Sequence, residues 1–106
     1  ENCPDLRNTK VPDIIDHLKS YGCKITVSDP FADMNEAKKH LNIDLLDLDQ
    51  IARSDVVILT VAHDDYKEFN KEQWQNMFNS NGVFIDVKSI FNNDFFTGTN
   101  INHWRL

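Results

Sequence analysis

Residues that interrupt or cross-link a polypeptide are scarce in this sequence. Its 106 residues include only three glycines, three prolines and two cysteines. The cysteines, Cys3 and Cys23, are too few for a disulfide scaffold and lack the four-ligand spacing of a structural zinc site. We therefore interpret them as reduced thiols of a cytoplasmic protein.

A long apolar run and an N-terminal leader are lacking too. The longest apolar run, residues 56–62, is far shorter than the about 20 residues that a membrane-spanning helix needs. Residue 1 is Glu rather than Met, and no basic segment followed by an apolar one comes after it. We expect no membrane span and no signal peptide, and we interpret the chain as a fragment of a longer protein.

Positive charge is in the minority. Lys and Arg number 11 against 17 Asp and Glu, so the formal net charge is −6. An acidic surface repels phosphate backbones, which argues against nucleic acid as the main partner. The shares of apolar residues, 41%, and charged residues, 26%, are typical of one folded domain at this length.

Predicted helices alternate with predicted strands along the chain. After a cap at Asn8 or Thr9, apolar residues recur at helical spacing, with Pro12 in the first turn and Gly22 at the end. Residues 56–61 form an aliphatic run typical of a strand buried on both faces. The other expected elements are strand 23–27, helix 33–41, edge strand 43–46, short helix 48–54, helix 71–79, a turn at Asn81-Gly82, strand 83–87, and an irregular segment 88–106 anchored by Phe91, Phe95, Phe96 and Trp104.

This order predicts a Rossmann-like α/β domain of three layers with a mostly parallel sheet. A doubly wound sheet has its first strand near the centre, yet this chain opens with a loop and a helix. We therefore expect the first central strand to be truncated. Its place would lie between strands 23–27 and 56–61, to be filled by earlier residues or by another chain.

Two cations are expected at the carboxyl edge of this sheet, where open parallel sheets bind ligands. Lys88 follows strand 83–87, and Arg7 lies in the loop before the first helix. A guanidinium and an ammonium at one edge, beside a helix N-terminus, favour a phosphate-bearing ligand. The alternative is that each cation pairs with a neighbouring carboxylate, as surface cations commonly do.

Other polar residues at strand ends make weaker candidates. His63-Asp64 resembles half of an acid–base pair, but no nucleophile is placed to use it, and a histidine that caps a strand end is the simpler reading. Asp29 holds the position of a ribose-binding acid, but no Gly-x-Gly-x-x-Gly precedes it, so Asp29-Pro30 is better read as a turn. The remaining histidines have no spacing suited to a metal, and we predict no metal site.

Five segments resemble, in order, the C-terminal domain of the UDP-glucose/GDP-mannose dehydrogenase family. The opening ten residues (ENCPDLRNTK) and the ending Trp-Arg-Leu are the specific ones, and they are most similar to bacterial enzymes that oxidise UDP-N-acetylhexosamines for surface polysaccharide. The matching segments are residues 1–10, 27–30, 56–63, 84–88 and 104–106. The resemblance implies that residues 1–106 are the C-terminal, UDP-sugar-binding domain of such an enzyme.

The resemblance also implies a reaction and its participants. An absent N-terminal Rossmann domain would bind NAD and carry the catalytic Cys, so this chain would hold no catalytic residue and would be inactive alone. The full-length homodimer would oxidise the sugar C6 hydroxyl to a carboxylate with NAD. Arg7 matches an arginine that reaches toward NAD, and Lys88 falls where many members have a substrate-binding Arg in Asp-Gly-Arg. Here that motif reads Asp86-Val87-Lys88, so a bidentate fork becomes a point charge.

Two other classes of protein compete with this reading. A receiver-like signalling module is also doubly wound, and Asp29, Thr60 and Lys88 approximate its conserved positions, but its central phosphoacceptor Asp has no candidate here. A stand-alone interaction or nucleotide-binding α/β module is the third reading. Uptake of phosphate from acetyl phosphate would favour the receiver-like module, and absence of nucleotide affinity would favour a pure interaction domain.

Overall fold

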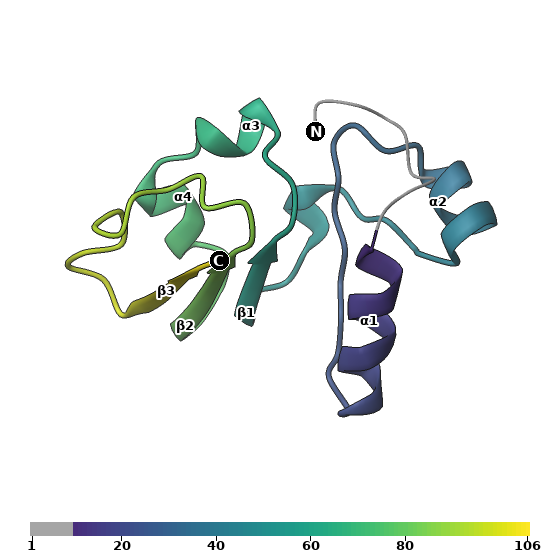
Figure 1. Cartoon of the computed structure of the whole chain (residues 1–106), viewed down its shortest axis with the longest axis horizontal. Helices are drawn as coiled ribbons and strands as arrows, with labels where there is room; N and C mark the ends of the chain where they lie inside the picture. The colour runs from purple at the N-terminus through teal and green to yellow at the C-terminus, as the bar shows by residue number, and fades with distance from the viewer. Residues whose placement is uncertain (1–9) are drawn as a thin grey trace. The chain divides into compact units, whose positions relative to one another are not determined.

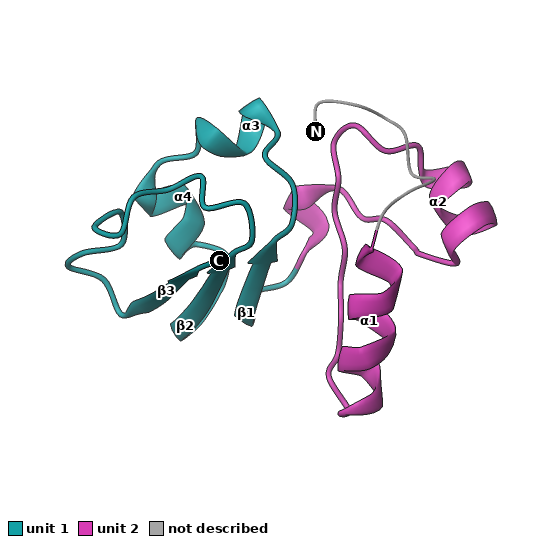
Figure 2. Cartoon of the chain, in the orientation of Figure 1, with its two compact units in different colours: residues 1–2, 52–106 teal, residues 3–51 magenta. Residues whose placement is uncertain are grey.

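The computed structural model describes residues 10–106. The described residues divide into two compact units, residues 10–51 and residues 52–106 (Figure 2). Each unit has its own cluster of buried apolar side chains. Among residues 10–106, none of the helices combines the length and apolar character needed to cross a bilayer.

Two helices dominate the unit of residues 10–51. Helix α1 (Val11–Ser20) has Pro in its first turn and ends at Tyr21, followed by Gly22 at φ +83, as predicted. The predicted cap at Asn8 or Thr9 was wrong, because Lys10 occupies the N-cap position and supplies no side-chain hydrogen bond there. The two predicted cap residues themselves lie outside the described residues.

Helix α2 (Met34–Leu41) confirms the helix predicted over residues 33–41. The Asp33 carboxylate accepts a hydrogen bond from the Glu36 N–H at 2.9 Å, which satisfies one of the helix's unpaired donors. Asn42 ends the helix in the left-handed conformation, with φ 54. Ala37 on this helix packs with Ile15 of α1 and with Ile43, forming the small core of this unit.

The strands predicted over residues 23–27 and 43–46 do not form, and a single bridge joins the two segments. Val27 and Leu45 form an isolated parallel bridge, and the Leu46 N–H donates to the Val27 carbonyl at 2.9 Å. Most side chains of residues 23–26 are exposed, so little apolar burial supports a longer pairing. The predicted helix 48–54 is likewise only a short 3-10 turn, η1 (Leu48–Gln50).

The unit of residues 52–106 contains a three-stranded parallel sheet, in the order β1 (Ser54–Leu59), β2 (Phe78–Asp86), β3 (Ile101–Arg105) (Figure 1). Leu59 is opposite Asp86 in one pairing, and Asp86 is opposite Arg105 in the other. The carboxyl ends of all three strands therefore meet at one edge. Parallel strands with flanking helices confirm the Rossmann-like α/β class.

Helix α4 (Lys71–Gln75) is shorter than the helix predicted over residues 71–79, and β2 begins where that helix was expected to end. The predicted turn at Asn81-Gly82 was also wrong, because both residues lie within β2. The spacing of Trp74, Met77 and Phe78 fits a helix, but pairing with β1 overrides that local preference. Gly82 permits this path, since a Cβ there would lie 2.0 Å from a ring carbon of Phe78.

Beyond β2, residues 101–105 form β3 where an irregular segment was predicted. Trp104 was expected to anchor this segment, but it is 63% exposed, because side chains alternate along β3 and Trp104 lies on the face opposite the covered side chains of Ile101 and His103. Phe91 and Phe96 are buried as predicted, and Phe95 packs against them. A four-residue helix, α3 (Asp64–Lys67), was not foreseen either.

Aromatic rings cover one face of this sheet. The Trp74 ring of α4 lies 4.9 Å from that of Phe84 on β2 and 5.8 Å from that of Phe91, measured between centroids. Phe84 also lies 5.0 Å from Phe96. These edge-on and tilted contacts pin the segment after β2 onto the sheet, and so fix the strand end that carries the candidate site.

Candidate functional site

Lys88 lies in a tight turn at the carboxyl end of β2. The turn comprises residues 86–89, which we call the Lys88 turn, and is closed by a 3.1 Å hydrogen bond from the Ser89 N–H to the Asp86 carbonyl. The Val87 N–H donates to the Leu59 carbonyl at 3.0 Å, which ties the turn to the end of β1. Lys88 itself is exposed. The structure thus places this predicted site residue where strand-end reasoning expected it.

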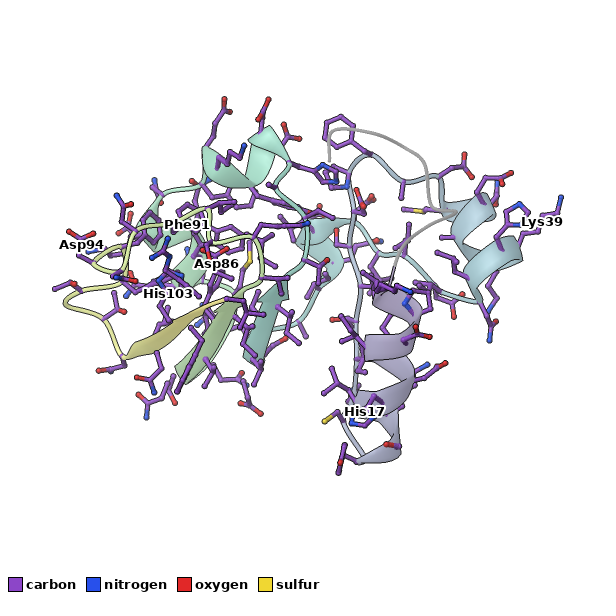
Figure 3. The ribbon with its side chains drawn as sticks, viewed as in Figure 1. His17, Lys39, Asp86, Phe91, Asp94 and His103 are labelled. Atoms are coloured by element: carbon purple, nitrogen blue, oxygen red, sulfur yellow. The ribbon has the colours of Figure 1, made fainter. Side chains whose placement is uncertain are left out.

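A buried carboxylate holds the segment that follows the Lys88 turn. The Asp86 side chain has no exposed surface, and its Oδ1 accepts the Ile90 N–H at 3.0 Å. Its Oδ2 accepts the Phe91 N–H at 3.0 Å and lies 3.2 Å from Nε2 of His103 (Figure 3). Three N–H donors compensate the cost of burying this charge, because each replaces a hydrogen bond to water.

The end of the chain also contacts the Lys88 turn. Ser89 adopts a left-handed conformation, with φ 52, and its hydroxyl donates to the Leu106 carbonyl. The Leu106 N–H in turn donates to the Asp86 carbonyl at 3.3 Å. The turn that carries Lys88 is therefore fixed from both sides, by the carboxylate beneath it and by the residues after β3.

The segment after β1 lies beside this turn, since Val87 is bonded to the last residue of β1. His63 there is 1% exposed, with its ring 5.7 Å from that of Tyr66, and it precedes α3 at the N-cap position. The Asp64 carboxylate is exposed and lies 3.6 Å from Lys67 Nζ. These contacts fit the reading of His63 as a structural histidine at a strand end.

Asp29 and Arg7 are the other residues that the sequence offered for the site. Asp29 accepts the Phe31 N–H at 2.9 Å, the hydrogen bond of a turn, which fits the interpretation of Asp29-Pro30 as a turn. Arg7 lies outside the described residues, so its convergence with Lys88 stays a prediction. Within residues 10–106, no cluster of three His, Cys, Asp or Glu side chains is arranged to hold a metal ion.

Comparison with known families shows which family the chain belongs to. The model of the UDP binding domain of the UDP-glucose/GDP-mannose dehydrogenase family matches residues 1–93. The chain belongs to this family. Membership in this family agrees with the resemblance found in the sequence, and it argues against the receiver-like alternative.

Individual relatives of this dehydrogenase family agree. The chain is 50% identical to Protein CapL of Staphylococcus aureus over 94 residues, which is 89% of the chain and 22% of that protein. It is 34% identical over 94 residues to UDP-N-acetyl-D-glucosamine 6-dehydrogenase of Pseudomonas aeruginosa, covering 89% of the chain and 22% of that enzyme. The corresponding enzyme of Salmonella typhi is 30% identical over 90 residues, 85% of the chain and 21% of the enzyme. The chain spans about a fifth of the length of these curated relatives.

Within this UDP-binding domain, the sequence reasoning missed two residues that shape the site. Asp86 was noted only as the first residue of the Asp86-Val87-Lys88 motif, and His103 only among the histidines without metal spacing. Residues 101–105 give no apolar alternation that would signal a strand, since Asn102 and His103 stand where a strand pattern would have aliphatic residues. The pairing of β3 with β2 then sets His103 opposite Phe84, close enough to Asp86 for a hydrogen bond.

Proposed function

We propose that the chain is the substrate-nucleotide-binding domain of an NAD-dependent UDP-sugar 6-dehydrogenase, with a UDP-N-acetylhexosamine as substrate. The observation that carries this proposal is the family match over residues 1–93. Relatives named as UDP-N-acetyl-D-glucosamine 6-dehydrogenases support the substrate class. The product, a sugar carboxylate, would serve surface polysaccharide synthesis in the cytoplasm.

Lys88 is the residue of this chain that we assign to the substrate. Its ammonium supplies donors and a positive charge to the diphosphate of the UDP-sugar. The turn that carries it is held by Asp86, Ser89 and Leu106, so little conformational freedom is lost on binding. In a chain of net charge −6, a cation at this edge also offsets the repulsion of the nucleotide.

NAD is not assigned to the described part of this chain. Dinucleotide folds place a glycine-rich turn against the pyrophosphate, but the three glycines here, Gly22, Gly82 and Gly98, are isolated from one another. NAD would supply the oxidant in the full-length enzyme, bound mainly by its N-terminal domain. Arg7 is proposed to reach that cofactor, and the full-length enzyme is proposed to be a homodimer.

Activity measurements on two forms of the protein test this proposal. We expect the chain alone to produce no NADH from UDP-N-acetylglucosamine and NAD, since the nucleophile and dinucleotide site would lie elsewhere. The full-length enzyme should form two NADH per sugar, because oxidation of an alcohol to a carboxylate removes two hydrides. A clear NADH signal from the chain alone would refute the proposal that the nucleophile and the dinucleotide site lie outside this chain. Absence of NADH from the folded full-length enzyme with every UDP-hexosamine tried would refute the activity.

A further inference from the structure

The last strand of the chain is bonded to the Lys88 turn at two points. His103 on β3 lies 3.2 Å from the Asp86 carboxylate, through Nε2. After β3, Leu106 exchanges hydrogen bonds with Ser89 and with the Asp86 backbone. Both attachments lie beyond residue 93, where the family match ends. They therefore belong to a part of the chain to which the comparison assigns no role.

The surroundings of His103 indicate which proton makes the contact with Asp86. Its side chain is 4% exposed, and its ring lies 5.6 Å from that of Phe84 and 5.3 Å from that of Phe96. Nδ1 is buried and has no hydrogen-bond partner among the described residues. A carboxylate oxygen only accepts hydrogen bonds, so the contact at Asp86 requires that Nε2 carries a proton. His103 is then the donor and Asp86 the acceptor.

This hydrogen bond orients a carboxylate that in turn holds the backbone after Lys88. Oδ2 of Asp86 is shared between His103 and the Phe91 N–H, while Oδ1 takes the Ile90 N–H. The two backbone donors come from the segment directly after the turn. A carboxylate fixed at both oxygens can satisfy both donors only in one orientation. Removing His103 leaves Oδ2 with a single donor and loosens that orientation.

We propose that His103 is a positioning residue for nucleotide binding, acting through Asp86 to hold the Lys88 turn in its diphosphate-binding conformation. This inference rests on the proposed function, because it assumes that Lys88 contacts the UDP-sugar. His103 does not itself touch the ligand. Its effect on affinity arises because a turn already ordered in the free protein loses less conformational freedom when the ligand binds.

The test is a double-mutant cycle on the full-length enzyme, with the dissociation constant of UDP measured by calorimetry. His103→Leu keeps an apolar side chain between Phe84 and Phe96 but removes the donor. We expect UDP binding about 10-fold weaker, the size of a typical coupling between groups of one network. His103→Gln retains an N–H at similar reach and should recover most of the affinity. In the Lys88→Ala background, His103→Leu should change UDP affinity less than about 2-fold.

The outcomes separate this inference from the proposed function. If Lys88→Ala alone leaves UDP affinity unchanged, the assignment of Lys88 to the substrate fails, and this inference fails with it. If Lys88→Ala weakens binding but His103→Leu has the same effect in both backgrounds, only the positioning role of His103 is refuted. A purely structural histidine would give that additive result.

A second variant covers the case in which His103→Leu does not fold, as judged by circular dichroism. Ser89→Ala removes the hydroxyl that donates to Leu106 and leaves the buried core intact. It should weaken UDP binding about 3-fold when Lys88 is present and have no further effect in Lys88→Ala. Equal effects of Ser89→Ala in the two backgrounds would overturn the proposal that the end of the chain positions Lys88.

Discussion

Replacing Asp86 with alanine is expected to destabilise the chain by about 3–5 kcal/mol, because it removes the acceptor of several hydrogen bonds at the end of β2. The substitution leaves three N–H groups, those of Ile90, Phe91 and His103, without their acceptor. Each unsatisfied buried donor costs about 1–3 kcal/mol. The free energy of unfolding would be measured by urea denaturation followed through tryptophan fluorescence, since Trp74 is buried in the same core.

Two further substitutions control this experiment. Asp94→Ala removes a carboxylate that is exposed on the loop after β2 (Figure 3), and it should change stability by no more than about 0.5 kcal/mol. Asp86→Asn keeps the shape of the side chain but turns an N–H₂ toward at least one N–H donor, so an intermediate loss is expected. A loss from Asp86→Ala no larger than that from Asp94→Ala would contradict the role assigned to the buried carboxylate.

Lys88→Ala is expected to weaken binding of the UDP-sugar to the full-length enzyme by about 10- to 100-fold, the scale of a charge-assisted hydrogen bond. The loss should appear both in the dissociation constant of UDP and in KM, because the diphosphate is bound throughout the reaction. Lys88→Arg supplies a planar fork, as the family resemblance implies for the Asp-Gly-Arg motif, and should retain affinity. Isothermal titration with UDP, combined with steady-state kinetics, measures both quantities.

The matched control for Lys88→Ala is Lys39→Ala, which removes the same charge from the exposed surface of α2 (Figure 3). It should leave UDP affinity within about 2-fold, since loss of one solvent-exposed charge changes the protein's field only slightly. Equal losses in the two variants would mean that net charge, rather than the position of Lys88, governs binding. Unchanged KM and kcat in Lys88→Ala would remove Lys88 from the substrate site.

Local signals in the sequence were sufficient where local interactions determine the structure. Apolar spacing and Gly22 predicted α1, the helix predicted over residues 33–41 agrees with α2, and the aliphatic run at residues 56–61 predicted β1 to within two residues at each end. Local signals failed where pairing between strands that are distant in the sequence determines the structure. The spacing of Trp74 and Phe78 fits one helix, but Phe78 begins β2, and its ring passes over Gly82. Helix-like spacing over so few residues does not distinguish the two states.

The candidate site divides in the same way. The position of Lys88 at the carboxyl end of β2 could be predicted, because residues that follow a buried parallel strand lie at the ligand-binding edge of the sheet. The hydrogen bond between Asp86 and His103 could not, because it joins residues 17 apart and depends on β3, which carries His and Asn where a strand pattern would have aliphatic residues. Trp104 misled for the same reason. Its size suggested burial, but it lies on the face of β3 opposite His103.

The position of the diphosphate in a crystal structure of the full-length enzyme with UDP tests the central claim most directly. We predict a phosphate oxygen within hydrogen-bond distance of Lys88 Nζ, beyond the carboxyl end of β2, with Arg7 at the same edge of the sheet. A diphosphate bound away from the Lys88 turn, with the Lys88 ammonium directed elsewhere, would contradict the account.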